Sequence, residues 1–342
     1  MGATAMLAEA LEAPAAVARL LAGNAALCRD LGRALRARPP RFVATGARGS
    51  SDNAAGYAKY LIEIRLGLAT ASLGPSVCSV YGVRPQLAGA LFLAVSQSGR
   101  SPDLLSLAAG ARAGGAVTAA LVNDEASPLA TSCEWVLPLR AGAERSVAAT
   151  KSWIASLAAI LQLVAAWSED AALRRATDRL PDDLAAAASA DWDAAAGLLA
   201  GAADLFVVGR GPGFAAAQEI ALKLKETAGL HAEAYSAAEL MHGPLPLAGP
   251  RFPVLVLSQD DAALPGLVEL VDLLIERRVP LLVAGPAARP GAVALPLAAG
   301  LHPFAAPIAL VQSFYPLAER VARARGRDPD RPPHLSKVTE TT

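Results

Sequence analysis

The stretch ALFLAVSQSGRSPD, residues 90–103, divides into three parts. Ala90–Val95 is a continuous apolar run, as expected for a strand buried on both faces of a parallel sheet. Four small or hydrogen-bonding residues follow it, at 96–99. Ser101 then precedes Pro102, which predicts a helix with serine as N-cap and proline at its first position. The stretch therefore predicts a strand, a polar loop and a helix in that order.

This pattern occurs twice in the chain at a spacing of 162 residues. The run LFLAVSQ at 91–97 matches PVLVLSQ at 253–259. Two further segments match at the same spacing: Arg48-Gly49 with Arg210-Gly211, and Val117–Leu121 with Val279–Val283. Three matches at one spacing indicate a duplicated domain rather than a solenoid of short repeats.

Strand-like and helix-like segments alternate within each copy. Asp103–Arg112 and Phe214–Glu226 have helical character, and each lies between short apolar runs. This alternation predicts an α/β fold of two domains, each a doubly wound parallel sheet flanked by helices. Ligands of such sheets bind beyond the carboxyl ends of the strands, so the loops there are the candidate sites.

The sequence divides into four predicted regions. They are an N-terminal helical segment (1–38), a first domain (39–178), a second domain (179–325) and a polar, proline-rich tail (326–342). A helical connection within about 168–193 is expected to link the two copies.

Composition excludes several classes of partner. Lys plus Arg and Asp plus Glu both total 31, so no net charge favours nucleic acid or a membrane surface. The apolar run from Ser152 to Trp167 is shorter than a membrane span and predicts a helix buried in a core or a subunit interface. The N-terminus lacks a basic signal-peptide region, and the three cysteines (Cys28, Cys78 and Cys133) show no disulfide framework. A cytoplasmic protein is expected.

The loop after the first-copy strand suits a phosphate. Ser96, Gln97, Ser98 and Gly99 present hydroxyls and free backbone N–H groups where a helix begins. A purely structural turn is the alternative. In the second copy this loop reads SQDD at 258–261, and two carboxylates there would repel a phosphate. Only the first copy is therefore expected to hold one.

The segment KLKETAGLHAEAYSAAELMHGP at 223–244 gathers two of the four histidines among three glutamates. A zinc site is not expected, because no third ligand accompanies His231 and His242. Glu219, Lys223 and Glu226 fall at i, i+4 and i+7, so they predict charge pairs along one helix face. A carboxylate and an imidazole here would also suit proton transfer on a sugar phosphate. The residues alone leave the solvated face and the acid–base site both open.

Taken together, six motifs resemble the sugar isomerase (SIS) family. The nearest likeness is to the isomerase half of glucosamine-6-phosphate synthase and to the SIS-type glucosamine-6-phosphate deaminases, over nearly the whole chain. The motifs are SQSG at 96–99, SVAATK at 146–151, ALKLKE at 221–226, HAEAY at 231–235, ELMHGP at 239–244 and LSK at 335–337.

The resemblance implies four catalytic residues. Glu226 matches the carboxylate that moves a proton between C1 and C2, and Lys223 matches a lysine that handles sugar hydroxyls beside it. His242 matches the histidine that assists ring opening, and in the family this histidine usually reaches the site from the partner subunit of a homodimer. Lys337 matches the lysine that forms a Schiff base with the ketose, so the tail would fold over the site.

The resemblance also implies a binding set for the phosphorylated amino sugar, with no metal and no cofactor. The implied residues are Ser50, Ser51, Ser96, Gln97, Ser98, Ser101, Val147 and Ala149. Ala149 stands where synthases often have serine, which leaves one hydroxyl fewer.

Departures from the synthases favour a deaminase. Residue 2 is Gly and the first cysteine is Cys28, so no glutaminase domain with an N-terminal cysteine is expected. The implied reaction converts glucosamine 6-phosphate to fructose 6-phosphate and ammonia. The alternatives are an isomerase or deaminase for another phosphosugar, such as galactosamine 6-phosphate or a fructosyl-amino acid 6-phosphate, and a sensor that binds sugar phosphate without turnover.

Overall fold

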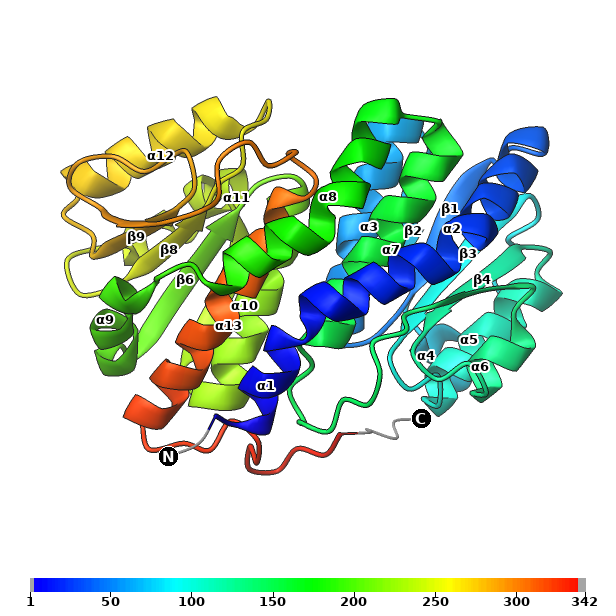
Figure 1. Cartoon of the computed structure of the whole chain (residues 1–342), viewed down its shortest axis with the longest axis horizontal. Coiled ribbons are helices and arrows are strands. Elements are labelled where there is room, and N and C mark those ends of the chain that lie inside the picture. Colours follow the sequence, from blue (N-terminus) through cyan, green and yellow to red (C-terminus); the bar gives the residue numbers. More distant parts are fainter. Residues whose placement is uncertain (1–2, 338–342) are drawn as a thin grey trace. The chain divides into compact units, whose positions relative to one another are not determined.

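The computed structural model of the chain describes residues 3–337, which divide into two compact units that interleave along the sequence. The N-unit contains Ala13–Glu144, Lys151–Pro181 and residues 336–337. The C-unit contains residues 3–12, Arg145–Thr150 and Asp182–Leu335. Each unit is built on one parallel sheet of five strands (Figure 1).

The N-unit sheet has the strand order β2-β1-β3-β4-β5, with every neighbouring pair parallel. Its strands are β1 Phe42–Gly46, β2 Thr70–Ser72, β3 Ala90–Ser96, β4 Val117–Val122 and β5 Trp135–Pro138. All seven residues of β3 are buried, which confirms the predicted strand at Ala90–Val95. Buried strands of this kind leave polar residues only at the strand ends.

Helices cover this sheet and form part of its core. They are α2 Ala13–Ala37, α3 Ser50–Leu66, α4 Ser76–Ser79, α5 Pro102–Ala113, α6 Pro128–Ser132, α7 Lys151–Ser168 and the start of α8 Ala171–Ala188. The boundary between the units falls at Pro181 within α8. By length and composition α7 could cross a membrane, but 83% of it is buried, so it is the core helix that the sequence predicted.

The C-unit sheet has the order β10-β9-β8-β6-β7, again parallel throughout. Its strands are β6 Asp204–Gly209, β7 His231–Ser236, β8 Val254–Leu257, β9 Leu281–Ala284 and β10 Val293–Leu295. Its helices are α1 Ala5–Leu11, α9 Ala196–Gly201, α10 Pro212–Ala228, α11 Ala237–His242, α12 Leu264–Glu276 and α13 Ala306–Ala324, with short 3-10 turns η1 Asp193–Ala195 and η2 Leu245–Leu247.

The two sheets share one connectivity at one spacing. Helices α3 and α10 begin 162 residues apart, and so do α5 and α12. The residues that precede α3 and α10 are Gly49 and Gly211, with φ values of 54° and 56°. Positive φ is readily adopted only by glycine, so the repeated Arg-Gly pair marks the same turn in both units. The predicted fold class, two parallel α/β sheets flanked by helices, is confirmed.

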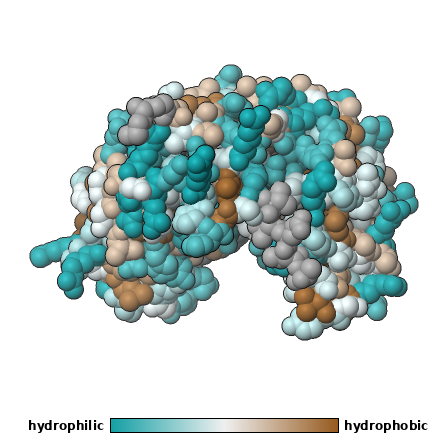
Figure 2. Space-filling model, turned by 90° about the horizontal axis from the view of Figure 1, so that it is seen from below, coloured by the Kyte–Doolittle hydropathy of each residue, from teal (hydrophilic) through white to brown (hydrophobic). Residues whose placement is uncertain are grey.

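The apolar residues are mostly inside the units, although the mean hydropathy of the chain is +0.36. On the face drawn in Figure 2, hydrophilic side chains predominate and apolar ones form small separate spots. Residues 326–335 of the tail pack with the C-unit, where the Asp330 carboxylate accepts hydrogen bonds from Ala5 N and Met6 N, both at 2.7 Å. The four predicted region boundaries stay predictions.

Arg325, just after α13, fixes the end of α10 inside the C-unit. Its guanidinium donates to Ala228 O at 2.9 Å, and to Ala200 O and Ala202 O at 2.9 and 2.8 Å. These carbonyls lie at helix ends, where no further helical N–H reaches them. One planar group with five donors therefore holds α9, α10 and α13 together.

We expect Arg325→Met to lower the free energy of unfolding by about 2–4 kcal/mol, because it leaves several part-buried carbonyls without a charged donor. Denaturant unfolding followed by circular dichroism measures this. Arg331→Met, at an exposed arginine, is the control and should change stability by no more than about 0.5 kcal/mol. Equal effects of the two substitutions would contradict the assigned role.

Candidate active site

A cavity of about 400 Å³ opens in the N-unit where β1 and β3 end. These neighbouring strands lie at the point where the strand order of the sheet reverses direction, the usual ligand position in such folds. The lining residues are Arg48, Gly49, Ser51, Val95, Ser96, Gln97, Ser98, Ser101, Leu104 and Lys337. Five of the eight predicted binding residues and one predicted catalytic residue are therefore brought together.

The loop after β3 has a conformation that its own side chains support. Ser96 Oγ accepts a hydrogen bond from Gly99 N at 3.0 Å, and Ser98 Oγ accepts one from Arg100 N at 3.3 Å. Gly99 has φ of +62°, and a Cβ at this position would lie 2.2 Å from Ser127 Oγ. Glycine is thus required here both by the backbone and by the close neighbour.

Ser101 occupies the N-cap position of α5 with Pro102 at the first turn, as the sequence predicted. Its side chain makes no capping hydrogen bond within the helix. Ser101 also lines the cavity, and its hydroxyl is not engaged in capping the helix. The N–H groups that begin α5 add a positive helix end to the same loop.

Arg48 is a site residue that the sequence reasoning missed. It lines the cavity, and its Nε and Nη2 donate to Asp103 Oδ2 at 2.8 and 2.7 Å. The Asp103 side chain is 1% exposed, whereas Arg48 is half exposed. The buried carboxylate therefore orients a cation at the cavity. The repeated Arg-Gly pair contains Arg48, but its hydrogen-bonding partner Asp103 lies 55 residues further along the chain.

Lys337 reaches this cavity from the end of the described chain, and its Nζ lies 2.8 Å from Glu144 Oε2. Ser50, the first residue of α3, is not among the lining residues. Val147 and Ala149 lie in Arg145–Thr150, a segment that groups with the C-unit.

A second candidate group lies on α10 of the C-unit. Lys223 Nζ contacts Glu226 Oε2 closely and lies 3.5 Å from Glu219 Oε1, which confirms the predicted pairs. The Lys223 and Glu219 side chains are fully buried, while Glu226 is 21% exposed. Two carboxyl groups share the Lys223 amine, and Glu226 is the member that reaches solvent. Such a carboxylate can accept and return a proton.

The two histidines of the segment 223–244 belong to different elements, β7 and α11. His231 begins β7, and its Nδ1 lies 2.7 Å from Asp204 Oδ1 in an exposed pair. His242 ends α11 and is exposed. Within residues 3–337, no group of three or more His, Cys, Asp or Glu side chains is arranged to hold a metal ion.

Side chains of the matching loop in the second copy make hydrogen bonds within the C-unit. Gln259 is fully buried, and its Nε2 donates to Arg210 O at 2.9 Å and to Asp261 Oδ2 at 3.0 Å. Ser258 Oγ donates to Ala284 O at 2.8 Å. Gln259 and Asp260 also line a cavity of about 550 Å³ in the C-unit, where Asp260 stands at the position of Ser98. The two loops therefore differ in the charge that they present, and the expected absence of phosphate from the second copy stays a prediction.

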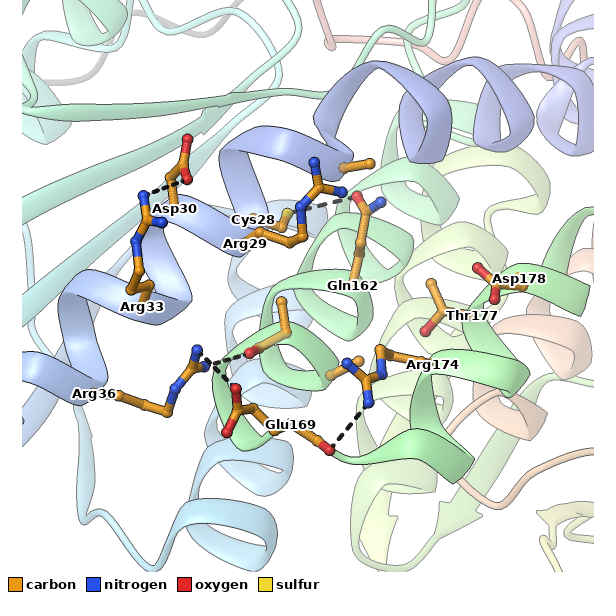
Figure 3. A pocket seen from close by; sticks show the side chains of 13 residues that line it. Cys28, Arg29, Asp30, Arg33, Arg36, Gln162, Glu169, Arg174, Thr177 and Asp178 are labelled. Atoms are coloured by element: carbon orange, nitrogen blue, oxygen red, sulfur yellow. Dashed lines mark hydrogen bonds and ion pairs between the residues drawn. The ribbon is translucent and has the colours of Figure 1, made fainter.

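A further cavity of about 410 Å³ lies between α2, α7 and α8 (Figure 3). Arginines line it, but Arg33 pairs with Asp30 at 2.9 Å and Arg36 pairs with Glu169 at 3.1 Å. Burial raises the pKa of the Cys28 thiol on its wall to about 12, so this thiol is no nucleophile near neutral pH. The pairing of Arg33 and Arg36 and an inert thiol make it a poorer candidate than the cavity at β1 and β3.

The profile of the SIS domain matches residues 40–166 and 198–283. The chain belongs to the SIS-domain family. Both matched segments fall on the sheets described above, and the first contains Arg48 and the loop at 96–101.

Three relatives place the chain within the family. A provisionally assigned phosphosugar isomerase of Silicibacter pomeroyi has a crystal structure 44% identical in sequence, with a TM-score of 0.91, covering 96% of this chain and 100% of that one. The C-terminal domain of glucosamine-fructose-6-phosphate aminotransferase from Francisella tularensis is 25% identical, with a TM-score of 0.83, covering 97% and 99%. Glutamine–fructose-6-phosphate aminotransferase of Aeropyrum pernix is 34% identical over 358 aligned positions, covering 97% of this chain and 56% of that protein. This SIS protein thus spans about half the length of the curated relatives it matches.

Proposed function

We propose that this SIS protein is a phosphosugar isomerase that deaminates glucosamine 6-phosphate to fructose 6-phosphate and ammonia. The proposal rests on one observation above all, the N-unit cavity at the ends of β1 and β3, lined by hydroxyls and two cations. The likeness to the isomerase half of the aminotransferases supports the substrate class.

The phosphate group is assigned to the loop 96–101. Serine hydroxyls, backbone N–H groups and the start of α5 supply donors, and Arg48 supplies a charge held in place by Asp103. Charge-assisted donors of this kind favour a dianion over a neutral sugar. The sugar ring would then lie beyond the phosphate, toward the mouth of the cavity.

The reaction needs three chemical events. The pyranose opens to the C1 aldehyde, a proton moves from C2 to C1, and the resulting C2 imine takes up water to give a ketone and ammonia. One base can serve both carbons if it lies on one face of the chain. Glu226 is assigned this role because it is the partly exposed carboxylate of α10, oriented by the buried Lys223.

Ring opening is assigned to His242 in a homodimer, where it would be supplied by the partner subunit. The histidine is exposed at the end of α11, and exposed apolar residues flank it, Met241 at 48% and Leu247 at 61%. Exposed apolar side chains beside a functional residue are typical of a surface covered by a partner. Imidazole is suited to donating and accepting a proton near neutral pH.

Two other functions use the same cavity. Another amino or keto phosphosugar would require only different contacts to the ring. A sensor would need the phosphate loop, but not the buried Lys223 and the carboxylate it orients on α10. This pair therefore favours turnover over binding alone.

We expect purified protein to release ammonia and fructose 6-phosphate in equal amounts from glucosamine 6-phosphate. Glu226→Gln should reduce kcat by about 100-fold or more and change KM little, because the amide keeps the shape but cannot take a proton. A coupled assay for both products measures this. Wild-type kcat in the variant would remove Glu226 from the proton transfer.

Ser98→Asp should raise KM for the phosphorylated sugar by about tenfold or more, because a carboxylate in the loop repels the phosphate. Asp260→Ser is the matched control, since Asp260 stands at the corresponding position of the second copy. It should leave KM unchanged. An unaltered KM in Ser98→Asp would show that the phosphate binds elsewhere.

Mixing inactive Glu226→Gln and His242→Ala subunits tests the shared site. If His242 acts in the partner's site, each mixed dimer has one intact site, and random pairing restores about a quarter of the wild-type activity. The measurement is activity after the two variants are unfolded and refolded together. Recovery no greater than the sum of the two variants would place His242 in its own subunit's site.

A further inference from the structure

Glu144 is a buried carboxylate that the proposed reaction does not use. Its side chain is fully buried in the N-unit, directly before the chain passes into the C-unit at Arg145. It accepts hydrogen bonds from Ser152 N at 3.0 Å and Ser152 Oγ at 2.6 Å, at the start of α7. Its third contact is Lys337 Nζ at 2.8 Å.

The contact with Lys337 joins residues 193 positions apart in the chain. Residues 182–335 belong to the C-unit, whereas 336 and 337 belong to the N-unit. The ion pair is therefore a side-chain interaction that holds the returning segment at the N-unit cavity. Because the carboxylate is fully buried and the lysine is 22% exposed, loss of the lysine would remove a cation that compensates a buried charge.

The local electrostatics keep this carboxylate ionised at neutral pH. Burial alone would raise the pKa of Glu144, but the charge of Lys337 and hydrogen bonds from Lys337 and Ser152 hold it below its usual value of 4.5. Lys151, the neighbour of Ser152 in α7, is a second buried cation in this part of the chain. The pair is thus a carboxylate with an ammonium, not two neutral groups.

We propose that Glu144 is a positioning residue, which holds Lys337 in the wall of the phosphate cavity and thereby anchors the C-terminal segment there. In this arrangement Lys337 Nζ donates a hydrogen bond to the Glu144 carboxylate, and the Lys337 side chain lines the cavity as a cation. To form a Schiff base, Nζ must first leave Glu144 and lose a proton. Its lone pair can then attack the ketone carbon, and water leaves as the imine forms. This catalytic consequence rests on the proposed function, whereas the anchoring does not.

Limited proteolysis tests the anchoring without reference to activity. Trypsin must take the Lys337 side chain into its own specificity pocket to release residues 338–342, and the ion pair with Glu144 prevents this. We expect Glu144→Gln to release this peptide about tenfold faster than the wild type under native conditions, measured by mass spectrometry. The amide still accepts the hydrogen bond from Ser152 N, so the start of α7 is preserved.

Two controls separate anchoring from general loosening. Ser152→Ala removes the shortest contact of Glu144 but keeps the ion pair, so release should stay near the wild-type rate. Lys337→Arg removes the amine but keeps a cation and a trypsin site, so the bond after residue 337 should stay protected. The proposal would be overturned if folded Glu144→Gln released the peptide at the wild-type rate. It would also be overturned if Ser152→Ala released the peptide as fast as Glu144→Gln.

A second measurement applies even if Glu144→Gln fails to fold. A carboxyl whose folded pKa is lowered stabilises the protein above pH 4.5, and this contribution is lost as pH falls through the lowered pKa. The wild type should therefore be more stable than Lys337→Met at pH 7, with the gap closing below about pH 4.5. A gap that is independent of pH would overturn the charge pairing. Persistent anchoring with no turnover of any phosphosugar would instead reject the proposed function alone.

Discussion

The burial of β3 on both faces is the constraint on which the site depends. A strand covered on both sides by helices has no place for polar side chains along its length, so they collect where it ends. The adjacent β1 ends at the same edge, where the strand order reverses, and the loops after both strands diverge. Ser96–Ser101 and Arg48–Ser51 therefore meet at one cavity although they are far apart in the chain. The same arrangement exists in the C-unit, where Gln259 and Asp260 line a cavity of about 550 Å³ and the Gln259 amide nitrogen is engaged by Arg210 O and Asp261.

Both cations that line the N-unit cavity are held by buried carboxylates. Asp103 orients Arg48 from the first turn of α5, and Glu144 orients Lys337 from the segment before α7. In each pair a carboxylate balances the positive charge of the cation. An arriving phosphate would gain from cations whose positions are already fixed, at little cost in side-chain ordering. In the α10 group one lysine, Lys223, lies beside two carboxylates, Glu219 and Glu226, and under the proposed function the partly exposed Glu226 is the base.

Several features of the fold and site followed from sequence patterns that are local. Continuous apolar runs identified β3 and β8, and the Ser-Pro pair located the start of α5, because strand burial and helix capping are decided by neighbouring residues. The i, i+4, i+7 spacing likewise predicted the contacts of Lys223 with Glu219 and Glu226. Arg48 could not be recognised in this way, since its hydrogen-bonding partner Asp103 belongs to another loop.

By itself the sequence determined the strand–helix alternation, the 162-residue repeat of the Arg-Gly turn and the different residues of the loops at 96–99 and 258–261. Each of these depends on the local period of apolar residues or on the backbone freedom of glycine. Composition describes the tail as a polar end, and only the family resemblance of the LSK motif implied that it folds over the site. The tertiary structure shows that it returns Lys337 to the N-unit cavity and that Glu144 receives it there. A contact across 193 residues is set by the path of the folded chain and by one buried carboxylate, and neither leaves a periodic signal in the sequence.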